Sequence, residues 1–323
     1  MNIYIPAIYH KINRGGKEFF CKRLAKAFQK LNINIIKNWR EEHDLSLHVT
    51  KIEKDKKEVK KILRLNGVYH NLSQDYKKLN INLKKNMHKP DAIVYQSLFS
   101  KKICDKYIGK FQKPITIISN GFDSSIFDDI KPTIRKYKYN FLSFSRWRPH
   151  KRLIDIIKCF KLAAIPDSCL YIAGDISVLN LTKKDKKKYL EKIKNIIYLG
   201  KIKEKEIYRY LKICDAFIHL CWIDNCPNAV IEAIAAGRTV ITNNVGGTKE
   251  IVEPSGGIVC KIDKPYNLEP CRLYEPPKFD YNIVINAMKQ VIKEKRKIYK
   301  KHIEMEDIAR QYKKFFEYVL GKK

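Results

Sequence analysis

Two carboxylates flank the start of a predicted helix in the sequence DNCPNAVIEAIAAG, where they are Asp224 and Glu232. Pro227 suits the first turn of this helix and Gly237 suits the residue after its end, so the helix spans about ten residues. Glu232 interrupts an otherwise apolar run, and a helix that is apolar on every face is buried. A lone buried carboxylate needs a partner. Two interpretations stay open: a structural salt bridge or bond to backbone amides, or a carboxylate that accepts hydrogen bonds from ligand hydroxyls.

A group of cations lies at a second helix start, in the sequence SRWRPHKRL that follows a predicted strand. Cations at a helix amino terminus are locally unfavourable because the helix dipole is positive there, so they indicate solvent exposure or a bound anion. Arg146 and Lys151 could hold a diphosphate, the first through its planar fork and the second as a point charge. The free N–H groups of the helix after Pro227 offer a further anion site.

The elements that must position these residues alternate in the second half of the chain. Short apolar runs separated by helix-like segments such as 151–164 and 205–213 are typical of a buried parallel sheet with helices on both faces. Such a doubly wound domain binds ligands at the carboxyl ends of its strands. The predicted strands are 141–145, 170–173, 196–199, 216–221, 239–242 and 257–260.

The first half of the chain repeats this α/β pattern. A glycine loop over 14–17 leads into a predicted amphipathic helix that ends near Lys30. A polar, basic segment over 129–140 is the expected linker. The tail from Met305 to Leu320 carries apolar residues at helical spacing. The predicted strands are 2–5, 33–36, 46–49, 61–65, 92–95 and 115–119.

The chain has 323 residues and a net charge of +32, and the excess of basic residues is spread over both halves. Lysine-rich solvated helix faces, an anionic membrane surface, an anionic acceptor and nucleic acid are the possible reasons. A nucleic-acid partner is not expected, because no motif for binding it is present. The nine cysteines form no Cys-x-x-Cys pair, and neither a signal peptide nor a transmembrane run is seen. These features indicate a cytoplasmic protein, with peripheral attachment to a membrane face as an option.

The order FLSFSRWRPHKRL, LYIAGD, IIYLGKI, ICDAFIHL and DNCPNAVIEAIAAGRTVITNNVGGTKEIV closely resembles the family-4 retaining glycosyltransferases. That resemblance implies the GT-B architecture, in which two doubly wound Rossmann-like domains face each other across a cleft. The expected domains are 1–135, an acceptor-side domain joined by the C-terminal helix 305–323, and 136–304, which binds the sugar nucleotide.

The resemblance also assigns site residues. Arg146 and Lys151 match the basic pair that holds the donor diphosphate, and Glu232 matches the glutamate that binds the ribose hydroxyls. Asp224 matches the glutamate that touches the donor sugar, but it is one methylene shorter, which leaves the sugar open. These four are the expected catalytic residues. The turn whose backbone amides face sugar and phosphate in relatives is matched by Cys226, Pro227 and Asn228.

In the first domain, Gly15 and Gly16 match the glycine loop of the family's first strand, where the absence of a Cβ permits close approach to the diphosphate. Family members usually carry a histidine near the reaction centre. Asn66 or His70 is expected near the acceptor, although a lone histidine there is more often a surface or packing residue.

The implied reaction moves a sugar from a nucleoside-diphosphate sugar, UDP- or GDP-linked, to a glycan, lipid-linked or other hydroxyl acceptor with retained anomeric configuration. The sequence holds neither an Asp-x-Asp motif nor another metal-ligand cluster, which agrees with a metal-independent enzyme without a cofactor. The alternatives are a sugar-nucleotide-binding protein that has lost catalysis and, less favoured, a basic nucleic-acid-binding protein.

Overall fold

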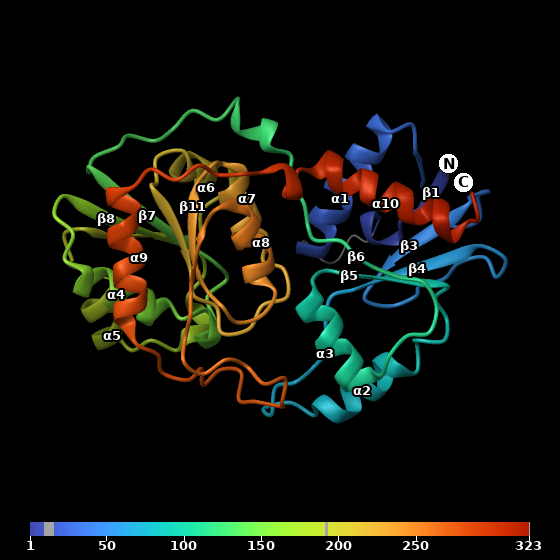
Figure 1. Ribbon diagram of the computed structural model, residues 1–323, viewed down its shortest axis with the longest axis horizontal. Coiled ribbons are helices and arrows are strands. Elements are labelled where there is room, and N and C mark those ends of the chain that lie inside the picture. The colour runs from blue at the N-terminus through green and yellow to red at the C-terminus, as the bar shows by residue number, and fades with distance from the viewer. Residues whose placement is uncertain (10–15, 191–192, 323) are drawn as a thin grey trace. The chain divides into compact units, whose positions relative to one another are not determined.

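The computed structural model describes residues 1–9, 16–190 and 193–322 and divides the chain into two compact units (Figure 1). The first unit comprises Met1–Asp123, Leu268–Cys271 and Lys301–Lys323. The second unit comprises Ser124–Asn267 and Arg272–Lys300. Each unit holds a parallel sheet of six strands with helices on both faces, so the predicted doubly wound α/β class is confirmed.

The first unit is built on the strand order β2-β1-β3-β4-β5-β6. Every described pair in it is parallel, which requires a crossover between consecutive strands. Its strands are β1 (Asn2–Tyr4), β2 (Asn34–Ile36), β3 (Leu45–Val49), β4 (Lys60–Leu65), β5 (Ala92–Tyr95) and β6 (Ile115–Ile117). Its helices are α1 (Gly16–Lys30), α2 (Tyr76–Lys84), α3 (Leu98–Ile108) and α10 (Met305–Val319).

One face of this sheet is covered by α1 and α10, whose aromatic side chains pack together in the core: Phe20, Phe28, Tyr312 and Phe316. Helix α10 packs closely against Gly121, which follows β6 in the chain. A Cβ added there would lie 2.8 Å from the Ile308 side chain, so only glycine fits without movement. The opposite face packs against α2 and α3.

The second unit has the strand order β12-β11-β10-β7-β8-β9, again with parallel pairs. Its strands are β7 (Tyr139–Phe144), β8 (Ser168–Ala173), β9 (Ile196–Gly200), β10 (Ala216–His219), β11 (Thr239–Asn243) and β12 (Ile258–Cys260). Its helices are α4 (Leu153–Ala163), α5 (Lys183–Tyr189), α6 (Glu204–Leu211), α7 (Asn228–Ala235), α8 (Thr248–Ser255) and α9 (Tyr281–Lys293).

An apolar core lies between one face of this sheet and the helices α4 and α9, which lie side by side in Figure 1. The strands β7, β8, β10 and β11 are almost wholly buried, as the continuous apolar runs predicted. Within the described ranges, every helix is too short or too polar to cross a bilayer.

The connection from β7 to α4 differs from the expected helix over 151–164. A short 3-10 turn, Pro149–Lys151, comes first, and Arg152 then adopts a left-handed conformation with φ 58° before α4 begins at Leu153. The buried Arg152 is held there by an ion pair with Asp155 and by the carbonyl of Pro277. Lys151 therefore ends a tight turn after the strand, and does not form part of the helix.

Candidate functional site

The predicted cation and carboxylate meet at the topological switch point of the second unit. The chain leaves β7 to build β8 and β9 on one side, and later builds β10, β11 and β12 on the other. In sheets of this kind, ligands bind outside the carboxyl ends of the strands on either side of such a reversal. Lys151 follows β7, and Asp224 follows β10. The two residues come from the two strands that border the switch point.

Lys151 and Asp224 form a close ion pair, with Nζ 2.5 Å from Oδ2. Their side chains are 17% and 19% exposed, so the pair is largely withdrawn from water but still reachable. Burial alone lowers the pKa of Lys151, but the Asp224 carboxylate and Cys221 outweigh it and raise that pKa above its usual value. Burial likewise raises the pKa of Asp224, and the net shift is downward because Lys151 and His219 lie close. The pair is charged at neutral pH.

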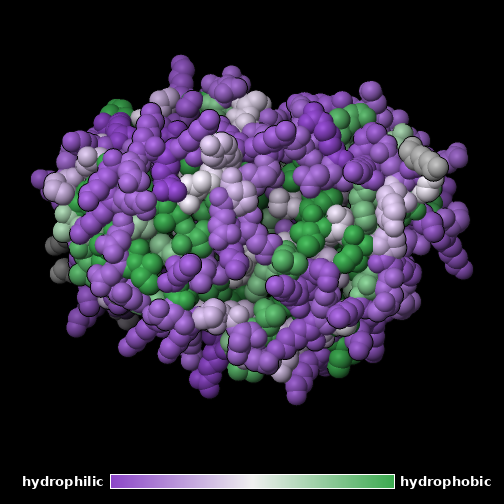
Figure 2. All heavy atoms as spheres, viewed as in Figure 1, coloured by the Kyte–Doolittle hydropathy of each residue, from purple (hydrophilic) through white to green (hydrophobic). Residues whose placement is uncertain are grey.

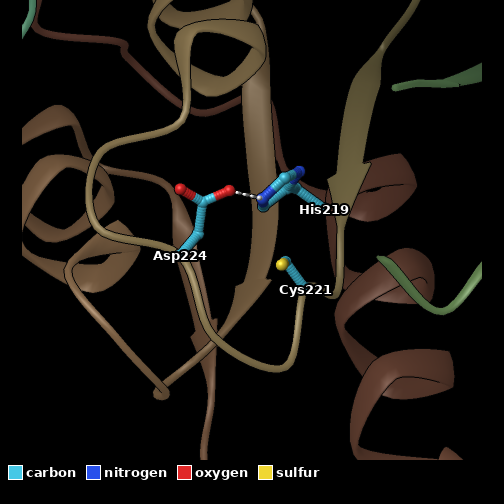
Figure 3. A group of neighbouring side chains, drawn as sticks. All are labelled: His219, Cys221 and Asp224. Atoms are coloured by element: carbon cyan, nitrogen blue, oxygen red, sulfur yellow. Dashed lines mark ion pairs between the residues drawn. The ribbon is translucent and has the colours of Figure 1, made fainter. Parts of the chain in front are cut away.

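Two further side chains complete this cluster, His219 at the end of β10 and Cys221 just after it (Figure 3). His219 points toward Asp224, with Nε2 3.9 Å from Oδ2. Burial, and then the Lys151 charge, lower the pKa of His219 to about 3, so its ring is neutral. Burial raises the pKa of Cys221 to about 11, and Lys151 donates a hydrogen bond to its sulfur. Sequence reasoning missed both residues because it placed them inside a strand that runs to Cys221.

The expectation that the chain lacks a cluster of metal-ligating side chains needs correction. His219, Cys221 and Asp224 each offer a ligand atom, and these atoms lie within 4.8 Å of one another. The sequence does not show the cluster, because the spacing H-x-C-x-x-D matches no common metal motif, and the turn after β10 brings the three together. The Lys151 ammonium lies against two of them and is the cation of the site in this structure.

A glycine turn before α8 holds Asp224 in place. Gly246 has φ +76°, and a Cβ there would lie 2.4 Å from the Asp224 carbonyl oxygen. The next residue, Gly247, donates its N–H to the same oxygen at 2.8 Å. Any other residue at Gly246 would meet both the backbone strain and the clash. This turn was part of the quoted motif, but its role as a clamp on Asp224 could not be predicted from spacing.

The helix after Asp224 departs from the expectation in one respect. Cys226 and Pro227 are buried, and Pro227 is the residue before the first turn, which Asn228 begins. Glu232, however, is half-buried rather than buried. The helix is therefore not enclosed on every face: its partly exposed residues lie on one stripe, which consists of Asn228, Ala229, Glu232 and Ala236. The predicted full burial of Glu232 is therefore wrong, because one stripe of the helix is left partly exposed.

Arg146 is exposed, at the end of β7. It lies near Asp175, whose pKa is lowered first by hydrogen bonds from Ser177 and then by the charges of Lys201 and Arg146. Its neighbour Trp147 is buried and donates from Nε1 to the Ala173 carbonyl at 2.9 Å. Arg146 is thus presented at the strand ends on a rigid backbone, whereas Lys151 is held inside the cluster.

The residues expected from the first unit are Gly15, Gly16, Asn66 and His70, of which the structure describes the last three. Gly15 lies outside the described residues, and Gly16 is the exposed first residue of α1. Asn66 bonds to three polar side chains at the carboxyl ends of the strands: those of Arg64, Thr50 and Gln96. His70 is half-buried, with burial lowering its pKa, and its carbonyl accepts from the Cys271 N–H.

Residues 125–269 match the family described as "Glycosyl transferases group 1". This stretch includes β7 to β12, the Lys151–Asp224 pair and the glycine turn. The stretch that is similar to this family therefore lies almost wholly in the second unit.

The chain is also similar to two curated proteins. An uncharacterized glycosyltransferase of Methanocaldococcus jannaschii, MJ1059, is 27% identical over 203 residues, which is 59% of this chain and 49% of that protein. An Escherichia coli protein named UDP-Gal:alpha-D-GlcNAc-diphosphoundecaprenol alpha-1,3-galactosyltransferase is 28% identical over 166 residues, 47% of this chain and 42% of that protein. The chain thus spans about half the length of the curated relatives it matches.

The fold of the whole chain is also that of solved glycosyltransferases. Anabaena HepE, solved in complex with UDP and glucose, aligns over 98% of this chain and 99% of its own with a TM-score of 0.63 and 14% identity. At that identity the likeness concerns the fold alone. Together with the two Rossmann-like sheets, it confirms the GT-B fold class.

Proposed function

We propose that this chain is a family-4 retaining glycosyltransferase that moves a sugar from a nucleoside-diphosphate sugar to a hydroxyl acceptor without a metal cofactor. The observation that carries the proposal is the Lys151–Asp224 pair at the switch point, inside the stretch that matches the glycosyltransferase group 1 family. A charged lysine in a half-closed site at the ends of parallel strands is suited to a phosphate ligand.

In this proposal the donor diphosphate takes the position beside Lys151. Its two phosphates would accept from the Lys151 ammonium and from the first N–H groups of α7, where the helix dipole is positive. Arg146, exposed at the end of β7, can reach a ligand outside the strands. When the donor binds, the Lys151 ammonium would bond to the diphosphate as well as to Asp224. In the chain without a donor, the ion pair with Asp224 positions the ammonium for this contact.

The carboxylates have different roles. Glu232, half-buried on the accessible stripe of α7, would accept hydrogen bonds from the ribose hydroxyls. Asp224, held by Gly247 and paired with Lys151, would face the donor sugar. Cys226, Pro227 and Asn228 form the turn between them and would offer backbone groups to sugar and phosphate. The shorter reach of Asp224 relative to glutamate places it closer to its own backbone, which bears on the choice of sugar.

The chemical step breaks the bond between the anomeric carbon and the diphosphate oxygen, and negative charge grows on the leaving diphosphate. Fixed cations and backbone N–H groups that already point at this position stabilise that charge without reorganisation. Lys151 and Arg146 supply the cations. The acceptor hydroxyl oxygen forms the new bond to the anomeric carbon, and its proton passes to the departing diphosphate oxygen. The configuration at the anomeric carbon is retained. Asn66 or His70 of the first unit is proposed to lie near this acceptor.

The donor and acceptor classes are proposed from two supports. The Escherichia coli relative is named for UDP-galactose and a diphosphoundecaprenol-linked acceptor, and HepE was solved with UDP. These favour a UDP-linked donor over a GDP-linked one, and a lipid-linked glycan as the acceptor. A lipid-linked acceptor agrees with the net charge of +32, which would attract the chain to an anionic membrane face.

A thermal-shift screen of UDP, GDP and their sugar conjugates tests this proposal. A ligand that binds only the folded chain raises the melting temperature, by an amount that grows with concentration above Kd. We expect UDP and one UDP-sugar to raise it, and Glu232→Ala to reduce that shift. If none of these compounds changes the melting temperature of the wild-type chain, the assignment of the site is wrong. A shift without any transfer to lipid-linked glycans would favour a binding protein that has lost catalysis.

A further inference from the structure

The His219, Cys221 and Asp224 cluster has a chemistry that phosphate binding does not use. An imidazole, a thiol and a carboxylate converge within 4.8 Å in the turn after β10 (Figure 3). His219 is 5% exposed, and its Nε2 has no hydrogen-bond partner among the described residues. A buried ring nitrogen without a partner is costly, and it is aimed at the Asp224 carboxylate 3.9 Å away. Such an arrangement suits a ligand that accepts a lone pair.

We propose that His219, Cys221 and Asp224 form an inhibitory site for a borderline-soft divalent cation, typified by Zn²⁺, which binds by displacing the Lys151 ammonium. Tetrahedral zinc bound to one nitrogen and one oxygen at about 2.0–2.2 Å holds those two atoms about 3.4 Å apart. The 3.9 Å between His219 Nε2 and Asp224 Oδ2 needs an adjustment of only about 0.5 Å to reach that value.

The type of ligand selects the ion. Thiolate and imidazole ligands favour zinc and cobalt, whereas magnesium prefers an all-oxygen shell. The metal binds the neutral imidazole of His219, and Cys221 releases its thiol proton to solvent when the metal–sulfur bond forms. The ion has a route inward, because the Lys151 and Asp224 side chains are 17% and 19% exposed.

Lys151 is the resident competitor. Its ammonium bonds to the Asp224 carboxylate at 2.5 Å and to the Cys221 sulfur, so it occupies the position of the ion. The flexible four-carbon stem lets the ammonium leave toward solvent. Once the ion is bound, the Lys151 ammonium has lost its ion pair with Asp224 and is repelled by the metal cation. The consequence for transfer, inhibition of the enzyme, rests on the proposed function, but binding of the ion does not.

The experiment is a titration of the full chain with Co²⁺, a spectroscopic substitute for Zn²⁺. We expect a near-ultraviolet thiolate-to-cobalt charge-transfer band and visible bands of a tetrahedral ion, saturating at one cobalt per chain and removed by Zn²⁺. Cys221→Ser should lose the charge-transfer band while its melting temperature shows that it folds. Cys260→Ser, at another buried cysteine of the same unit, should keep it.

Two further variants separate the site from a merely structural cluster. His219→Gln should weaken Co²⁺ binding at least about tenfold, since even outer-shell partners change metal affinity by that factor. Lys151→Ala should strengthen it at least about tenfold, because the competing ammonium is gone, although the same change impairs transfer under the proposed function. The inference is overturned if the wild-type chain gives no charge-transfer band, if Cys221→Ser retains it, or if Lys151→Ala binds Co²⁺ more weakly.

Discussion

Some residues of the site could be predicted from the sequence, and others became evident only from the packing of the folded chain. Lys151 and Asp224 were predicted from charge and from resemblance, and they lie 2.5 Å apart. His219 and Cys221 were missed, because a strand-like run gives no sign of where the strand ends, and these residues follow that end. The prediction that Glu232 is fully buried was wrong. An apolar run of eight residues does not show which side of the helix the neighbouring elements leave uncovered.

At Gly246, replacement by alanine should be more costly than at an ordinary left-handed glycine. Gly246→Ala meets both a positive φ and a Cβ placed 2.4 Å from the Asp224 carbonyl oxygen. Gly200→Ala is the matched control, with φ +68° and no atom within 4 Å of its Cβ. We expect the control to lower the free energy of unfolding by about 1 kcal/mol and Gly246→Ala by about 2 kcal/mol more, in urea denaturation. Equal losses in the two variants would show that Asp224 is not held by this turn.

At the scale of elements, prediction from sequence succeeded where apolar runs were long. The observed β7, β8, β10 and β11 overlap the predicted strands and differ at their ends by at most two residues. The start of α4 was missed by two residues because a left-handed Arg152 and a 3-10 turn precede it. Arg152 is held in this conformation by Asp155 and by the Pro277 carbonyl. Pro277 is 125 residues away in the chain, so the local sequence does not show the contact.

A buried polar cluster fixes the loop between β3 and β4. The Asp55 carboxylate contacts His43 Nε2 at 3.0 Å and His48 Nε2 at 3.2 Å, and its side chain is fully enclosed. Although burial raises the pKa of Asp55, hydrogen bonds from His48, Ser46 and the Lys56 N–H lower it to about 2. Because the folded pKa is below the unfolded value of about 3.9, the carboxylate stabilises the fold above pH 4.

Asp55→Asn should therefore lower the free energy of unfolding by about 2–3 kcal/mol at pH 7, because a carboxylate pKa lowered by about two units corresponds to that difference. This difference should shrink as pH falls from 4 toward 2, where the wild-type carboxylate becomes protonated. Urea denaturation at several pH values measures it. Glu42→Gln, at an exposed carboxylate of the preceding loop, should change stability by less than about 0.5 kcal/mol. A loss for Asp55→Asn that is equally small at pH 7 would contradict the role of the cluster.

At the scale of the whole molecule, the two sheets have different strand orders, and neither order could be read from the sequence. Strand order depends on pairings between segments far apart in the chain, such as β7 with β10, which leave no local pattern. The basic surplus was evident at once. Hydrophilic residues cover most of the face in Figure 2, and along α2 the residues Lys77, Lys78 and Lys84 are exposed. Residues 76–90 contain no acidic side chain.

The chain should sediment with vesicles that contain anionic lipid and stay in solution with neutral ones. Each lysine near an anionic surface contributes about 1 kcal/mol, and the attraction weakens as salt rises. The double variant Lys77→Glu and Lys84→Glu should bind at least about tenfold more weakly to anionic vesicles. A variant that reverses two exposed lysines of the second unit, Lys161 and Lys205, is the charge-matched control. Binding of the wild-type chain to neither kind of vesicle would remove the membrane proposal.

The most direct measurement is the rate of nucleoside diphosphate release from the sugar nucleotide that stabilises the chain, in the presence of lipid-linked glycan acceptors. The wild-type chain and Lys161→Ala, an exposed lysine on α4, should release it at equal, acceptor-dependent rates. Lys151→Ala should be at least about 100-fold slower, the usual cost of removing one group that stabilises a transition-state charge. A folded Lys151→Ala variant with the wild-type rate would contradict the assignment of transfer to the Lys151–Asp224 site.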